Sequence, residues 1–181
     1  MLSEAQVGRG VWNESDVHGG SGENTSRGGV DANFTAEMKY VLDMHNYFRH
    51  VVATGQIPGQ PASCFMPHLR WNSTLAKKAQ AWAEKCKFKD DPKLRGIGQN
   101  IVAYGDLRDN IMYWFDQYKN YNYCTDQCKR GTRCRHYTQM VWSETTDLGC
   151  GVKWCIFGKI KIFYLVCNYF PAGNVEGKKP Y

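Results

Sequence analysis

The sequence predicts an α+β fold, a sandwich in which helices flank an antiparallel sheet and disulfides stabilise the domain. Three observations indicate it: helical apolar spacing comes first, strand-like segments follow, and the chain holds eight cysteines. Helices that precede and flank such a sheet form a layered α+β domain. A chain of 181 residues is long enough for one domain with a proper core, and too short for two comfortable ones.

Residues 1–33 are expected to form an extended or disordered arm ahead of a folded domain at 34–181. The arm is rich in Gly, Ser, Asn and Glu, and its segment VHGGSGENTSRGGVD has no apolar period. Such a segment buries too little apolar surface to offset the entropy lost on ordering it.

Several features indicate secretion. Four N-x-S/T sequons, at Asn13, Asn24, Asn33 and Asn72, predict glycosylation. No apolar signal segment follows Met1, so we expect a mature chain from which a signal peptide has been removed. No apolar run reaches the roughly 18 residues that a membrane-spanning helix needs. We therefore expect an extracellular protein without a transmembrane segment.

The segment TAEMKYVLDMHNYFRHVVAT, residues 35–54, predicts a helix that is closed by Gly55. At about 100° per residue, its apolar residues form two stripes. One stripe comprises Tyr40, Met44, Tyr47 and Val51, and the other comprises Val41, His45, Phe48 and Val52. A core needs only one stripe, so the second needs a partner of its own. Another helix is the usual partner, and a bound lipid is the alternative.

The remaining elements follow in order. After a proline-rich irregular stretch, Asn72 is a suitable N-cap for a second helix, which carries Leu75, Ala79, Trp82 and Cys86 on one face. A third helix is predicted over residues 106–118. The segments HYTQMVW (136–142), GCGVKWC (149–155) and KIKIFYLVCNYF (159–170) predict strands, with a turn at Phe157-Gly158 between the last two.

Cysteine count and charge narrow the class of protein. An even number of cysteines in a chain of this size predicts disulfides and an oxidising compartment. Zinc is the competing explanation, because Cys124 and Cys128 have a ligand spacing, but no second tight Cys or His pair follows them. The net charge is 23 − 17 = +6, and the basic residues are scattered, which argues against a nucleic-acid partner.

Five motifs then occur in a recognisable order. HNYFR (45–49) and GQNI (98–101) precede CRHYTQMVW (134–142), LGCGVKWC (148–155) and YLVCNYFPAGN (164–174). Together with the cysteines they resemble the CAP superfamily, which comprises cysteine-rich secretory proteins, antigen 5 venom allergens and plant pathogenesis-related one proteins. The resemblance covers residues 35–181. No cysteine-rich extension follows Tyr181, as in single-domain members, and the Gly-Gln-Asn variant with the added cysteines indicates the venom allergen-like group.

The resemblance implies a three-layer α-β-α sandwich and a set of disulfides. By analogy, Cys86 pairs with Cys155, Cys128 with Cys134, and Cys150 with Cys167. The two cysteines left over, Cys64 and Cys124, are expected to bridge the loop before the second helix to the loop after the third.

Many family members have a central cleft with two His and two Glu, which can hold a divalent metal. The matching positions here are Asp90, Gln99, Gln117 and His136, so only His136 keeps the family residue. Amide oxygens are weak zinc ligands, and Gln does not titrate. We therefore expect no metal, no cofactor and no catalytic residues, with His136 hydrogen-bonded in a polar cleft and His45 packed under the sheet.

The recurrent family activity is lipid binding, and two sites follow from the resemblance. A loop resembling a caveolin-binding motif binds sterols in some members, and its counterpart here carries Tyr118, Tyr121 and Tyr123. The alternative is that these tyrosines pack on the sheet. A slot between the first and third helices accepts a fatty-acid chain in some members, and here it would be lined by Tyr40, Met44, Tyr47, Val51 and Ile111.

The sequence thus predicts a secreted, glycosylated CAP-domain protein that binds sterols, and fatty acids in the helix slot, without catalysis. The alternative is an extracellular protein-interaction module, for instance a ligand for a host receptor. A metal-dependent hydrolase is disfavoured by Asp90, Gln99 and Gln117.

Overall fold

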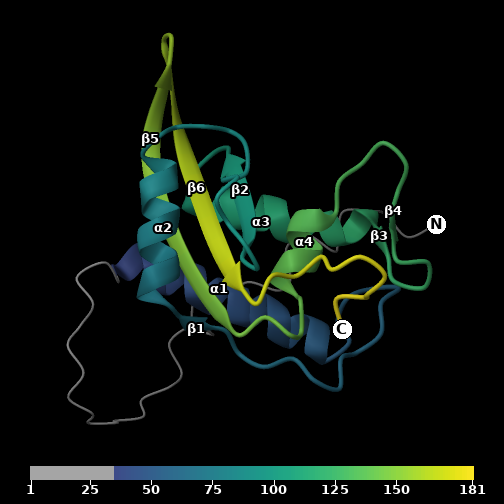
Figure 1. Ribbon diagram of the computed structural model, residues 1–181. Coiled ribbons are helices and arrows are strands. Elements are labelled where there is room, and N and C mark those ends of the chain that lie inside the picture. The colour runs from purple at the N-terminus through teal and green to yellow at the C-terminus, as the bar shows by residue number, and fades with distance from the viewer. Residues whose placement is uncertain (1–34) are drawn as a thin grey trace, which may run out of the picture. The chain divides into compact units, whose positions relative to one another are not determined.

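The computed structural model of the protein describes residues 35–181. The predicted arm, with its sequons at Asn13, Asn24 and Asn33, lies outside the described residues. In chain order (Figure 1) the elements are α1 (Ala36–Ala53), β1 (Arg70–Trp71), α2 (Ser73–Ala83), β2 (Gly98–Ala103), α3 (Leu107–Phe115), the 3₁₀ helix η2 (Asp116–Asn120), β3 (Tyr121–Asn122), β4 (Gln127–Cys128), α4 (Arg135–Met140), β5 (Asp147–Phe157) and β6 (Ile160–Phe170).

The central sheet has the strand order β1-β5-β6-β2. Strands β5 and β6 form one long antiparallel hairpin, and β2 pairs antiparallel with the other side of β6. The short strand β1 runs parallel to β5, so the sheet is mixed. The sequence had predicted a wholly antiparallel sheet. The difference comes from a pairing of two residues, Arg70 and Trp71, which is too short to leave a periodic signal in the sequence.

The two faces of the sheet bury different layers. On β6, Tyr164 and Val166 pack with the apolar face of α2, whereas Leu165, Cys167 and Tyr169 belong to the larger core with α1 and α3. This alternation is the period of two that a strand imposes on its side chains. Helix α2 therefore covers one face and the other helices cover the opposite face (Figure 1), which confirms the three-layer α-β-α sandwich.

Two glycines allow α2 to lie close against β5. A Cβ at Gly149 would lie 2.2 Å from the backbone nitrogen of Ala76, and a Cβ at Gly151 would lie 2.4 Å from Cα of Gln80. Backbone atoms cannot move aside as the end of a side chain can. The GCG motif is thus explained by helix–sheet packing on one face and by Cys150 on the other.

The predicted helices are present, and their ends follow from local chemistry. The Thr35 hydroxyl accepts the N–H of Met38 at the start of α1, and Asn72 accepts two N–H groups at the start of α2. Glycosylation of Asn72 stays a prediction. The third predicted helix is divided into two elements: the α-helix α3 ends at Phe115, and the 3₁₀ helix η2 follows it to Asn120.

The segment HYTQMVW was expected as a strand, and this expectation is wrong: its first part is helix α4. Tyr137, Thr138, Gln139 and Met140 are all buried, because neighbouring elements surround this short helix. A short segment buried on all sides shows no polar face, so its period cannot distinguish helix from strand.

Arg49 fixes the position of α4 relative to α1. Its side chain is fully buried, and its five N–H groups donate to the carbonyl oxygens of Pro67, Met140, Trp142 and Thr145, at 2.8–3.2 Å. Desolvation lowers the pKa of Arg49 to about 10, which leaves the guanidinium charged at neutral pH. Met140 is the last residue of α4, and Trp142 lies two residues after it. By binding these two carbonyls, Arg49 also positions the helix that carries His136.

Within residues 35–181, no helix combines the length and the apolar character needed to cross a membrane.

Candidate functional site

The four cleft positions come from four different elements. Asp90 lies in the exposed loop after α2, Gln99 on β2, Gln117 in η2 and His136 in α4. Asp90, Gln99 and His136 line one polar hollow of about 570 Å³, together with Arg133. Gln117 is buried behind His136. The structure therefore brings the four positions to one region.

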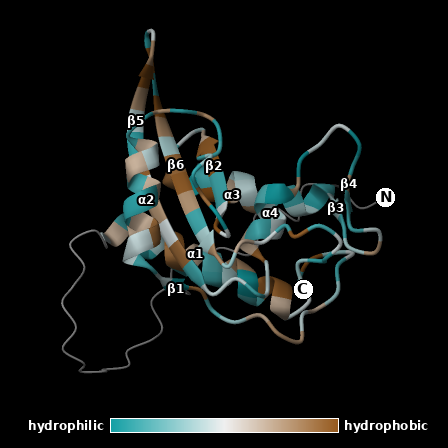
Figure 2. Cartoon of the chain, viewed as in Figure 1, coloured by the Kyte–Doolittle hydropathy of each residue, from teal (hydrophilic) through white to brown (hydrophobic). Residues whose placement is uncertain are grey.

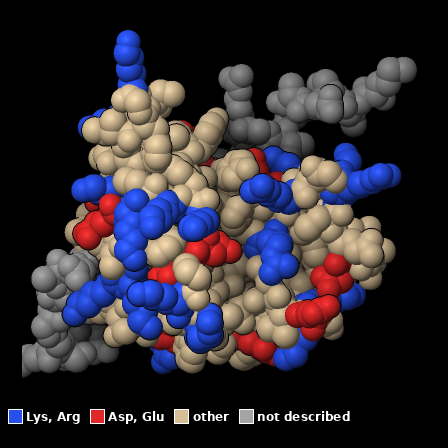
Figure 3. All heavy atoms as spheres, turned by 45° about the horizontal axis from the view of Figure 1, so that its top comes forward, with Lys and Arg blue, Asp and Glu red and all other residues tan. Residues whose placement is uncertain are grey.

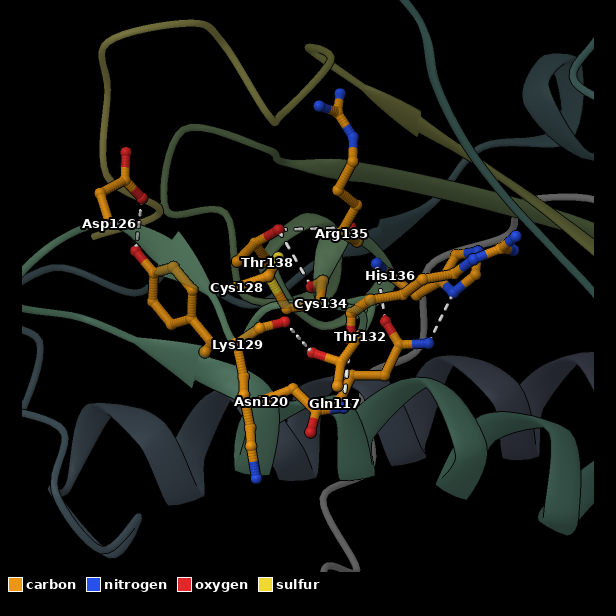
Figure 4. The surroundings of a disulfide bond; sticks show 12 residues. Gln117, Asn120, Asp126, Cys128, Lys129, Thr132, Cys134, Arg135, His136 and Thr138 are labelled. Atoms are coloured by element: carbon orange, nitrogen blue, oxygen red, sulfur yellow. Dashed lines mark hydrogen bonds between the residues drawn. A yellow bond between two sulfur atoms is a disulfide. The ribbon is translucent and has the colours of Figure 1, made fainter.

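Gln117 holds His136 by two hydrogen bonds, which Figure 4 shows. Its Oε1 accepts the backbone N–H of His136 at 3.2 Å, and its Nε2 lies 2.8 Å from Nδ1 of the same residue. A backbone N–H can only donate, so the oxygen of the amide must face it and the amide NH₂ must donate to Nδ1. The ring proton of neutral His136 is therefore on Nε2. Burial, with a smaller effect of Arg133, lowers the pKa of His136 to about 4 and keeps the ring neutral.

This tautomer is unfavourable for metal binding. A histidine binds a metal through a nitrogen lone pair, and here Nδ1 accepts from Gln117 while Nε2 carries the proton. Gln99 is also engaged, since its Oε1 accepts the N–H of Asp91 and its Nε2 donates to Asn168. Within residues 35–181 no group of three or more His, Cys, Asp and Glu side chains is arranged to hold a metal. The donor set does not fit a divalent cation.

A second buried histidine lies next to this site. His45 is fully buried, with Nδ1 2.7 Å from the carbonyl of Val41 and Nε2 2.8 Å from the hydroxyl of Tyr169. The carbonyl only accepts, so Nδ1 donates and Nε2 accepts from Tyr169. Asn100 donates both to that hydroxyl and to the carbonyl of His136. His45 is thus a structural residue under the sheet. Through Tyr169 and Asn100, its hydrogen bonds connect it to the first turn of α4.

The tyrosine loop is packed within the protein. Tyr121 is 7% exposed, and its hydroxyl donates to Asp126 at 2.7 Å. Its ring lies 6.0 Å from that of Tyr137, whose ring also contacts Tyr118. Tyr123 packs on Tyr181 with 4.9 Å between centroids and donates to the Tyr181 carbonyl. The rings pack on α4 and on the C-terminal segment, while strands β3 and β4 form the base of the loop.

Helix α1 packs against α3 in the main core. Met44 and Ile111 are both buried in the main core, and Phe48 stacks on Phe115 at 3.8 Å between centroids. Tyr40, Tyr47 and Val51 are half-buried against the same cluster. Phe48 belongs to the stripe of Val41, His45 and Val52, so this stack places α3 beside that stripe. The partner of Tyr40, Tyr47 and Val51 stays a prediction.

Three disulfides are present: Cys86–Cys155, Cys128–Cys134 and Cys150–Cys167. These are pairs that the family resemblance implied. The fourth expected bond is not formed, because Cys64 and Cys124 are free, exposed thiols. Each lies in an exposed loop, and Cys124 contacts the C-terminal segment through its carbonyl, which accepts from Lys179. An even number of cysteines does not by itself show that every cysteine is paired.

An apolar groove of about 610 Å³ adjoins the polar hollow. It follows the free edge of β2, and it shares Asp90, Arg133 and His136 with the hollow. Its other lining residues are Phe88, Lys89, Ile101, Val102, Ala103, Tyr104, Tyr113, Phe157, Ile160 and Ile162. Sequence reasoning missed this site. Aromatic residues outside every predicted apolar stripe, such as Phe88 and Tyr104, were the signal that could have indicated it.

Comparisons with known proteins agree with the fold. The profile of the cysteine-rich secretory protein family, CAP, matches residues 42–169. Venom allergen 5 of Polybia paulista is 41% identical over 162 residues, which cover 80% of this chain and 78% of the relative. Peptidase inhibitor 16 of Mus musculus is 35% identical over 153 residues, which cover 80% of this chain and 29% of that protein.

Two solved structures are also similar. Venom allergen-like protein 4 of Schistosoma mansoni has a TM-score of 0.72 and 34% identity, covering 81% of this chain and 94% of that one. The crystal structure of NaASP2 with Zn²⁺ has a TM-score of 0.69 and 28% identity, covering 85% and 90%. The three disulfides fit an extracellular protein of this kind. The chain belongs to the cysteine-rich secretory protein (CAP) family and is similar to its venom allergen-like members.

Proposed function

We propose that this protein binds single-chain lipids outside the cell, without catalysis. The observation that carries the proposal is the groove of about 610 Å³ along the edge of β2. Its volume lies in the range of small-molecule sites, and its wall is mainly aromatic and aliphatic. Tyr104, Tyr113 and Ile160 are exposed in it, so an apolar chain in the groove would remove apolar surface from water.

The polar end of the groove favours an anionic head. Arg133 supplies a positive charge, and the geometry of Gln117 leaves Nε2–H of His136 as a donor. Asp90 is the one carboxylate in the lining. A fatty acid has the matching chemistry, with an apolar chain for the groove and a carboxylate for the donors. The sterol site at Tyr121 and Tyr123 and the fatty-acid slot at Met44 and Ile111 stay proposals. A lipid could bind at either site only if these side chains moved out of their present contacts.

The absence of catalysis is proposed from the chemistry of the cleft. General acid–base catalysis needs a group that titrates near the working pH. His136 has a pKa of about 4 and is hydrogen-bonded at Nδ1, and the two glutamines do not titrate. Fatty-acid binding would then need nothing from the cleft except hydrogen-bond donors.

The test is a titration of the purified protein with a fluorescent fatty acid. Ala103→Trp, which fills the groove, should weaken binding at least tenfold, about 1.4 kcal/mol. Ala81→Trp, at an exposed position of α2, is the matched control and should bind like wild type. Arg133→Glu should weaken binding of the acid but not of the fatty alcohol of equal chain length, whereas Arg130→Glu should change neither.

Two further variants separate the sites. Tyr121→Ala with Tyr123→Ala should reduce binding of a fluorescent sterol at least tenfold if the loop binds sterols, and should leave the fatty acid unaffected. Met44→Trp should reduce fatty-acid binding only if the chain enters between α1 and α3. Fatty-acid binding that responds to Met44→Trp and not to Ala103→Trp would overturn the groove as the site. Absence of binding to either probe would leave the interaction module as the better proposal.

A further inference from the structure

The tip of the β5–β6 hairpin extends beyond the helices (Figure 1) and is strongly apolar. Trp154, Ile156 and Ile160 are 50%, 73% and 66% exposed, and Phe157 is exposed beside them. Figure 2 shows that hydrophobic residues continue along both strands of this projecting part. Large apolar side chains gathered at one projecting end mark an interaction surface rather than scattered surface residues.

The apolar character covers both faces of the ribbon. Trp154 and Ile156 lie on one face, where Ile156 pairs with Lys161 across the strands. Phe157 and Ile160 form a directly opposed pair on the other face, and Phe157 lies 4.9 Å from Phe88 between centroids. A ribbon with one face in water normally alternates apolar and polar residues. This tip therefore exposes large apolar side chains on both faces of the ribbon.

Positive charge accompanies the apolar tip. Lys153, Lys159 and Lys161 are exposed on the hairpin, and residues 148–165 contain no Asp or Glu. The Nζ of Lys161 lies 4.9 Å from the centre of the Trp154 ring, so its stem runs along the apolar surface while its charge stays at the end. Figure 3, which looks toward this end of the protein, shows blue side chains standing on tan surface.

The tip is also preorganised. The Cys86–Cys155 disulfide joins β5 to the loop after α2, and Gly158 adopts φ +60° in the two-residue turn. Two-residue hairpin turns require a positive φ at their first position, which glycine adopts readily because it has no Cβ. A surface that is already ordered loses little conformational entropy when it binds.

We propose that this hairpin tip docks the protein on anionic lipid bilayers. The apolar residues would enter the interface between head groups and acyl chains, and the lysines would contact anionic head groups. Each lysine near such a surface strengthens binding by about fivefold. A soluble polyanion would use only the lysines, so the apolar residues on both faces favour a bilayer. Phe157 and Ile160 of the tip also line the lipid-binding groove, whereas Trp154 and Ile156 lie outside it, so a change at Ile156 tests docking separately from the groove.

Co-sedimentation of the full oxidised chain with vesicles tests the proposal. Wild type should bind vesicles of equal parts phosphatidylserine and phosphatidylcholine, and should bind pure phosphatidylcholine at least tenfold more weakly. Ile156→Asp should reduce binding to the anionic vesicles at least tenfold. Phe65→Asp, at an apolar residue that is 68% exposed elsewhere, is the matched control and should bind like wild type.

A charge pair completes the design. Lys159→Glu with Lys161→Glu should abolish the preference for phosphatidylserine, whereas Lys77→Glu with Lys78→Glu changes the net charge equally and should retain it. Unchanged melting temperatures would show that the variants are folded, and retained fatty-acid binding would show that the groove is separate. Vesicle binding that is unaffected by Ile156→Asp would overturn the proposal. So would binding to heparin without binding to vesicles, or a dimer in solution that Ile156→Asp dissociates.

Discussion

Nδ1 of His136 accepts a hydrogen bond of 2.8 Å from the side-chain amide of Gln117. The same amide accepts the backbone N–H of His136, so its orientation is determined and the imidazole proton lies on Nε2. One side chain thereby determines what the cleft can bind. A carboxylate at position 117 would accept from Nδ1 instead, and would leave the lone pair of Nε2 facing the hollow.

Gln117→Glu should therefore create weak zinc affinity. In the variant, Nδ1–H of His136 donates to the introduced carboxylate, and Nε2 with Asp90 can contribute to a metal site. We expect zinc to raise the melting temperature of the variant but not that of wild type, because a ligand stabilises only the state that binds it. The rise should disappear when His136→Ala is added. A wild-type rise that His136→Ala abolishes would contradict the assigned tautomer.

Stability should decrease in mild acid. Burial lowers the pKa of both His45 and His136 to about 4, whereas an unfolded histidine titrates near 6.5. Between these values the unfolded chain binds more protons, so acid favours unfolding. From pH 7.5 to pH 5, each histidine should remove about 2 kcal/mol from the free energy of unfolding.

Urea unfolding at the two pH values measures this loss. His45→Gln should lower stability at neutral pH but should reduce the dependence on pH by about half. The exposed His50→Gln is the control and should leave the dependence unchanged. An equal free energy of unfolding at both pH values would contradict the neutral, buried state of the two rings.

Arg49→Lys should destabilise the protein by about 3 kcal/mol. Arginine satisfies four backbone carbonyls with five planar N–H groups, and a lysine ammonium has three donors and a different reach. Arg70→Lys is the control, because Arg70 is largely exposed in a surface ion pair and the change should cost less than about 0.5 kcal/mol. Equal losses in the two variants, measured by urea unfolding, would contradict the role given to Arg49.

Two thiols should react in the native state. Cys64 and Cys124 are exposed and unbonded, and the other cysteines are in disulfides. Mass spectrometry after maleimide treatment of the native protein should find two added groups on the described part of the chain, and one in Cys64→Ser. A native chain with no reactive thiol would show that the two loops form a fourth bond.

Sequence patterns predicted the layers well because each long element has a clear period. Helix α1 carries two full stripes, and β5 and β6 alternate about a two-residue turn. The period failed for α4, where four consecutive residues, 137–140, are all buried, and for β1, which has only two residues.

The site was harder to predict than the fold. The resemblance located Gln117 and His136, but residue identity alone could not show that the two are hydrogen-bonded or which nitrogen carries the proton. The groove along β2 was missed because its lining comes from several elements far apart in the sequence, such as Phe88, Tyr113 and Ile160. No single segment carries a periodic signal for such a surface.

The most direct test of lipid binding is a crystal structure of the protein with a bound saturated fatty acid. The chain should lie along the edge of β2 between Phe88 and Tyr113, with its carboxylate within hydrogen-bond distance of Arg133 or of Nε2 of His136. Electron density for the chain between α1 and α3, or over the rings of Tyr121 and Tyr123, would contradict the groove as the site.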